Sequence, residues 1–79
     1  MNNAIYKITS VIPTDRNMLL GCIVTRIEKV FVGEPAVFDV IFSSGRAVTV
    51  KTSSVRKINA QGNALIISTA NTTYVLKEL

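Results

Sequence analysis

Residues 36–52, AVFDVIFSSGRAVTVKT, predict a β-hairpin and decide the fold class of the chain. The first half of this stretch alternates with the two-residue period of a strand, so that apolar side chains such as Phe38 and Val40 share one face while Asp39 lies on the other. A Ser-Ser-Gly turn follows, and a second segment rich in Val and Thr returns along the first. We expect the face that carries Phe38 to lie in the core.

The same strand pattern extends over the rest of the 79 residues. Val, Ile and Thr are abundant, and their branched Cβ atoms favour a pleated sheet over a helix. Turn signals divide the chain into short segments with short connections, which favours antiparallel neighbours because a parallel pair needs a long crossover. The expected strands are residues 4–11, 18–31, 36–42, 46–52, 64–69 and 72–76, while 53–58 is either a strand or one 3₁₀ turn followed by a strand.

A sheet of this size without helices must cover its own apolar face. We therefore expect one domain, residues 1–79, in which an antiparallel meander of five to seven strands closes into a small all-β barrel. The strand lengths are compatible with barrels of the SH3-like or Sm-like kind, although no family motif is present.

The composition excludes most catalytic chemistry. The chain has no histidine and one cysteine, which excludes a histidine-activated nucleophile, a disulfide framework and a zinc site of the usual spacing. The five carboxylates are scattered, and no pair of them suggests general acid–base catalysis. We expect a protein that is not an enzyme, with no catalytic residues, no metal and no cofactor, and with Cys22 as a buried, inert thiol.

The sequence shows no targeting or membrane segment. The N-terminus begins Met-Asn-Asn and lacks the basic and apolar regions of a secretory signal. The longest stretch without a charge, residues 58–76, is interrupted by Asn, Gln, Ser and Thr, so its composition does not fit a membrane span. We expect a cytoplasmic protein that does not contact a membrane.

The mildly basic net charge of the chain is compatible with an anionic ligand. The formal net charge is +4, and basic residues surround a Ser/Thr-rich segment that could hold one helical turn with free backbone donors. The alternative, which we favour, is that this segment is a solvated loop whose serine side chains form hydrogen bonds with their own backbone. The candidate anion- or nucleic-acid-binding residues are Arg46, Lys51, Ser53, Ser54, Arg56 and Lys57.

Aromatic platforms for nucleic-acid bases are scarce. The three phenylalanines, Phe31 among them, are expected mostly in the core, which leaves Tyr6 and Tyr74 as the available rings. This weakens the case for nucleic-acid binding.

The chain carries more apolar side chains than the inside of one small barrel can hold. Several expected strands are apolar on both faces, so the surplus must meet another surface or pack beneath the chain's own loops. The uncharged segment 58–76 also lacks proline, so it is either central in its sheet or paired with another chain. We expect a symmetric homo-oligomer. The candidate interface residues are Leu20, Val24, Val37, Ile41, Ile66 and Tyr74.

Three functions follow from these observations. The first is a non-catalytic binding module, a homo-oligomeric regulator or inhibitor of a larger protein, of the type encoded by phages or mobile elements. The second is a small barrel that binds nucleic acid or a nucleotide through the basic Ser/Thr-rich segment. The third is a structural assembly subunit.

Overall fold

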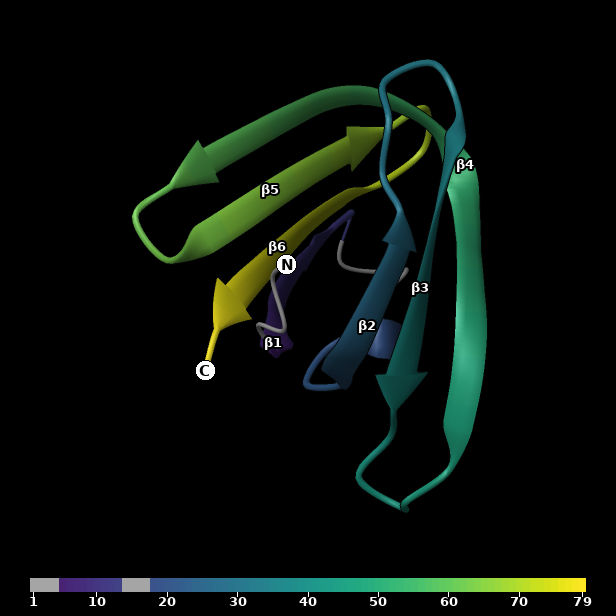
Figure 1. The fold of residues 1–79 in the computed structure, drawn as a ribbon, viewed down its shortest axis with the longest axis vertical. Helices are drawn as coiled ribbons and strands as arrows, with labels where there is room; N and C mark the ends of the chain where they lie inside the picture. The colour runs from purple at the N-terminus through teal and green to yellow at the C-terminus, as the bar shows by residue number, and fades with distance from the viewer. Residues whose placement is uncertain (1–4, 14–17) are drawn as a thin grey trace.

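Six antiparallel strands form a closed barrel in the computed structural model, which describes residues 5–13 and 18–79 (Figure 1). Each strand pairs with the next along the chain, and β6 pairs back with β1. The predicted all-β meander and its closure into a small barrel are confirmed. The strands are β1 (Tyr6–Ile12), β2 (Ile23–Lys29), β3 (Pro35–Ile41), β4 (Ala47–Gln61), β5 (Ala64–Thr69) and β6 (Thr73–Glu78).

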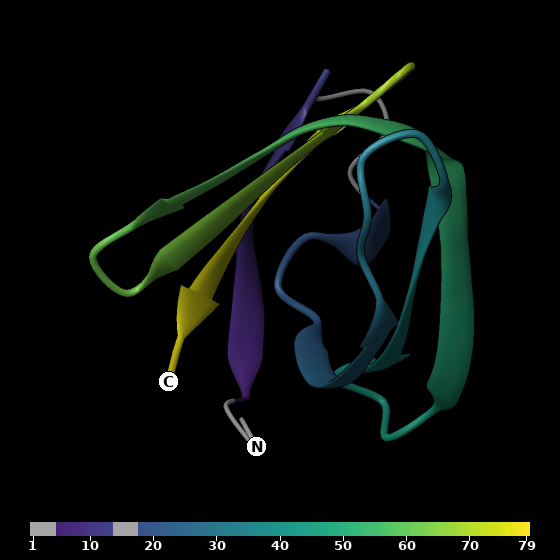
Figure 2. The same cartoon turned by 45° about the horizontal axis from the view of Figure 1, so that its top comes forward.

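The long strand β4 belongs to both sides of the barrel. Its first half pairs with β3 and its second half pairs with β5, so it curves over from one half of the barrel to the other (Figures 1 and 2). We call these halves the first sheet, made of β2, β3 and the first half of β4, and the second sheet, made of the second half of β4, β5, β6 and β1. The register shifts between Val55 and Lys57, where an extra residue bends the strand. Residues 53–58 therefore form neither a loop nor a 3₁₀ turn: they continue one strand through the bend.

The core lies between these two sheets. Ala36, Phe38 and Val40 are buried as their alternation predicted, while Phe42 packs against them half-buried. The ring of Phe38 meets the ring of Tyr74 edge to face, with centroids 6.1 Å apart. The largest fully buried side chains are Phe38, Ile8, Ile67, Leu76, Val24, Val40 and Val55.

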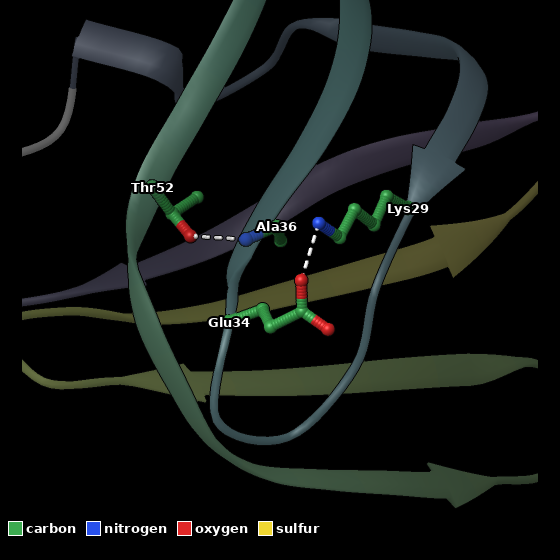
Figure 3. A network of polar contacts seen from close by, with 4 residues as sticks. All are labelled: Lys29, Glu34, Ala36 and Thr52. Atoms are coloured by element: carbon green, nitrogen blue, oxygen red, sulfur yellow. Dashed lines mark hydrogen bonds and ion pairs between the residues drawn. The ribbon is translucent and has the colours of Figure 1, made fainter.

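A buried hydroxyl fixes β3 against the bend of β4. The register between β3 and β4 shifts between Pro35 and Val37, so Ala36 lies out of the regular ladder. Its buried N–H donates instead to Oγ1 of Thr52, at 3.0 Å (Figure 3). The same hydroxyl donates to the carbonyl of Ser53, at 2.7 Å. One side chain thus completes the hydrogen bonding that the bulge interrupts.

A second hydroxyl network ties the β4 bend to the β5–β6 turn. The Ser53 hydroxyl donates to Oγ1 of Thr69 at 2.9 Å, and Thr69 in turn donates to the carbonyl of Thr72 at 2.9 Å. The N–H of Ala70 donates to the carbonyl of Ser54 at 2.9 Å. These bonds hold the turn against the strand at the point where the two sheets meet.

The segment before β2 departs from its prediction as a strand from 18 to 31. Residues 18–19 form a 3₁₀ turn, and β2 spans only Ile23–Lys29. Gly21 has a φ of +84°, a left-handed conformation that no extended strand contains. Its N–H donates to the carbonyl of Ile8, so the turn packs against β1. Position 4 of the first predicted strand lies outside the described residues.

The uncharged segment 58–76 spans the end of β4, all of β5 and most of β6. β5 and β6 each have a neighbour on both sides, whereas residues 58–61 of β4 pair with β5 alone. The reading in which the segment is central is therefore confirmed for β5 and β6, and among the described residues the end of β4 forms an open edge. Within the described residues, no helix is long and apolar enough to cross a membrane.

Candidate binding surfaces

The outer side of β2, β3 and the first half of β4 carries a row of apolar side chains. Ile41 pairs in register with Ile23 on one strand and with Ala47 on the other. These positions alternate with core residues such as Val40, so their side chains point away from the core. Ile41 remains 37% exposed. A continuous apolar row therefore crosses this sheet on its outer side.

Charges of both signs accompany this row in equal number. Arg26 pairs in register with Asp39, and Lys29 forms an ion pair with Glu34 (Figure 3). We call this surface the balanced face. Its basic residues are Arg26, Lys29 and Lys51, its acidic residues are Glu28, Glu34 and Asp39, and its uncharged residues are Ile23, Thr25, Val37, Ile41, Ala47 and Thr49.

A shallow hollow of about 310 Å³ lies on the balanced face. Asp39 is the one carboxylate that lines it, and its Oδ1 accepts a hydrogen bond from the Thr49 hydroxyl at 2.8 Å. Thr25, Ile41 and Ala47 are among the residues that complete the lining. General acid–base chemistry needs a second titratable group, and this hollow brings none to Asp39.

An exposed apolar turn lies at the β4-bend end of the balanced face. Phe31 and Val32, 59% and 62% exposed, open the turn that joins β2 to β3. The N–H of Glu34 donates to the carbonyl of Phe31 at 3.2 Å, and Gly33 supplies the positive φ of +94° that a type II turn requires. Two backbone hydrogen bonds to Val55 hold the turn against β4. The expectation that Phe31 lies in the core is wrong, because the turn directs it outward.

The outer side of the second sheet has a different character. Lys7 on β1 pairs directly with Lys77 on β6, and Lys57 lies on the same side of β4. No carboxylate of the described residues lies among them. We call this surface the lysine face. Its residues are Lys7, Ser10, Ile12, Lys57, Asn59, Gln61, Ala64, Ile66, Ser68, Thr73, Val75 and Lys77.

The predicted anion-binding residues do not form one site. Residues 53–54 form neither the helical turn considered for an anion site nor the solvated loop that we favoured, because β4 runs through them and the Ser53 hydroxyl donates to Thr69. The carbonyl of Ser54 likewise accepts from Ala70. The basic members are spread over the barrel: Lys51 lies on the balanced face, Lys57 on the lysine face, Arg56 at the bend between them, and Arg46 beside the β3–β4 turn.

The predicted interface residues also separate. Val37 and Ile41 lie together on the balanced face, whereas Ile66 belongs to the lysine face and Leu20, 49% exposed, to the turn before β2. The expectation is wrong for Val24, because it has no exposed surface and packs in the core. Tyr74 is half-buried, and its ring is turned inward against Phe38.

Cys22 is buried in the core, where the sequence placed it. Burial raises the pKa of its thiol, because removal from water disfavours the charged thiolate. The protonated thiol is a poor nucleophile, so this position acts as a small apolar side chain.

No protein-family model matches the chain, and comparisons with curated proteins and with solved structures found no significant match. The function must therefore be argued from the two faces themselves.

Proposed function

We propose that this chain is a non-catalytic binding module that assembles with a second copy of itself through the balanced face. The observation that carries the proposal is the outward apolar row formed by Ile23, Ile41 and Ala47. Val37 and the exposed Phe31–Val32 turn add apolar side chains toward the other end of β3, so the face has apolar side chains at both ends and the Arg26–Asp39 pair between them.

The amount of surface needed is compatible with a barrel of this size. A standard interface buries about 800 Å² on each partner. The chain has an accessible surface of 4976 Å², so such an interface would occupy roughly a sixth of it.

Charge favours the balanced face over the lysine face as the site of self-association. A two-fold axis brings one surface against the same surface of its copy. The balanced face offers as many basic as acidic side chains, so Arg26 and Asp39 of one copy can meet their opposites on the other. The lysine face would instead place lysines against lysines.

The dimer is proposed to serve as a regulator or inhibitor of a larger protein. Two observations favour a binding role: among the residues that line the hollow on the balanced face, Asp39 has no second titratable group beside it, and Cys22 is buried.

Two matched substitutions test the proposal. Ile41→Glu places a charge in the apolar row of the balanced face, and Ile66→Glu makes the same change on the lysine face. We expect only Ile41→Glu to reduce the native mass, measured by light scattering after size exclusion, while circular dichroism shows that both variants keep the sheet. Dissociation by Ile66→Glu alone, or by neither variant from an associated parent, would refute the assignment to this face.

A further inference from the structure

The lysine face contains a cross-strand pair that is unfavourable on its own. Lys7 and Lys77 lie directly opposite each other on β1 and β6, where paired Cβ atoms are about 5 Å apart. Like charges in such a pair destabilise a sheet. The ion pair of the described residues is Lys29–Glu34, on the other face, so no described carboxylate compensates this pair.

Glu78, the nearest acid along the chain, does not compensate the pair either. It is in register with Tyr6, whose ring packs against the core, so the Glu78 position is on the opposite side of the sheet from Lys77. Places where a sequence breaks a local rule without internal compensation are often functional.

The rest of the lysine face is rich in hydrogen-bond donors. Ser10, Ser68 and Thr73 contribute hydroxyls, and Asn59 and Gln61 contribute amides. These groups surround the half-buried Ile66 and Val75 in the middle of the sheet. The Thr73 hydroxyl donates to Oγ of Ser68 at 3.4 Å. Three cations and four other donor side chains, with no acidic side chain of the described residues among them, give a surface that complements an array of anionic oxygens.

We propose that the lysine face binds the phosphate backbone of double-stranded nucleic acid, independently of base sequence. This site differs from the basic Ser/Thr-rich segment considered at the level of the sequence, since only Lys57 belongs to both. It adjoins the balanced face, because Lys7 on β1 is in register with Ile23 on β2.

The spacing of the lysines fits a duplex. Thr73 and Lys77 are four residues apart on β6, about 13 Å, and Lys57 lies two strands away from β6, about 10 Å. Lys57 and the Lys7–Lys77 pair are therefore about 16 Å apart. The phosphates on each strand of a duplex succeed one another about every 3.4 Å of helix axis, so a separation of about 16 Å along the axis corresponds to about five base pairs.

Other anionic partners fit the face less well. Binding of single strands relies on aromatic side chains that stack on bases, and the lysine face has none, because the rings of Tyr6 and Tyr74 pack against the core. Anionic membranes favour surfaces that insert exposed apolar side chains. On this sheet the exposed Ile12 lies at one end and the exposed Ile5 and Leu79 lie together at the other, with polar groups between the two ends.

The test is the salt dependence of binding to a duplex of about 20 base pairs, two helical turns. Three phosphate contacts predict a slope of log K against log salt of about −2.7, which is a loss of about 40-fold between 50 and 200 mM salt. In Lys7→Gln/Lys77→Gln the slope should fall to about −0.9. The matched control, Arg46→Gln/Lys51→Gln, changes two cations outside the face and should leave the slope unchanged.

Folding and competing ligands complete the experiment. The Lys7→Gln/Lys77→Gln variant should unfold at the same temperature as the parent or higher, since it removes a like-charge pair, so lost binding will not reflect lost structure. The proposal is overturned if the duplex does not bind, or if the control and the face variant weaken binding equally. Tighter binding to a single strand of the same length, to polyglutamate or to phosphatidylserine vesicles also overturns it.

Discussion

The Thr52 hydroxyl provides the sharpest test of how the β4 bend is held. It accepts the buried N–H of Ala36 at 3.0 Å, where the register of β3 and β4 shifts. Thr52→Val keeps the side-chain shape and leaves that N–H without a partner. An orphaned buried donor costs about 1–3 kcal/mol, and for a domain of this size each kcal/mol lowers the unfolding midpoint by roughly 4–8 °C. We expect a loss of about 2 kcal/mol and roughly 8–16 °C.

The assay is thermal and urea unfolding followed by circular dichroism, with all proteins at one concentration because association shifts the midpoint. Thr52→Ser retains the hydroxyl and should retain most of the stability. Thr49→Val removes an exposed hydroxyl bonded to Asp39, and should cost less than about 0.5 kcal/mol. If Thr52→Val were as stable as Thr49→Val, the hydroxyl would not anchor the bend.

Two further predictions concern the β2–β3 turn and the buried thiol. Gly33→Ala should lower the free energy of unfolding in urea by about 1 kcal/mol, because φ at this position is +94°. A Cβ would meet no atom within 4 Å, so the cost comes from the backbone conformation, and Gly33→Asn should cost less. Equal costs for the two variants would argue against conformational strain. Because burial raises the pKa of the Cys22 thiol, the folded chain holds that proton more tightly than the unfolded chain does. This difference stabilises the folded chain fully below the ordinary pKa of the thiol, and the stabilisation is lost as pH rises through the raised pKa. The free energy of unfolding should therefore fall more steeply at alkaline pH in the parent than in Cys22→Ala. Parallel curves for the two proteins would contradict this.

The alternation of polar and apolar residues predicted the fold well. The period of residues 36–42 placed Ala36, Phe38 and Val40 in the core, and the short connections implied the antiparallel meander. Closure followed because an apolar sheet without helices has to cover itself. Local signals sufficed for these features because they depend on burial and chain length alone.

The surfaces were less accessible to sequence reasoning because they depend on register between distant segments. Lys7 and Lys77 are far apart in the chain, and only the β1–β6 pairing makes them neighbours. The serines at 53 and 54 suggested a cap, but contacts with the β5–β6 turn keep them in a strand. Val24 lies inside because the register of β2 against β3 shifts between Val24 and Arg26, which brings Val24 and Ile27 to the same inner side. Regular alternation along the sequence does not reveal such a bulge.

Sedimentation equilibrium of the unmodified chain over micromolar concentrations tests most directly whether the outward apolar row of the balanced face is covered by a second copy. The proposal predicts a mass of two chains, twice 8.6 kDa. A mass of one chain at every concentration would contradict it.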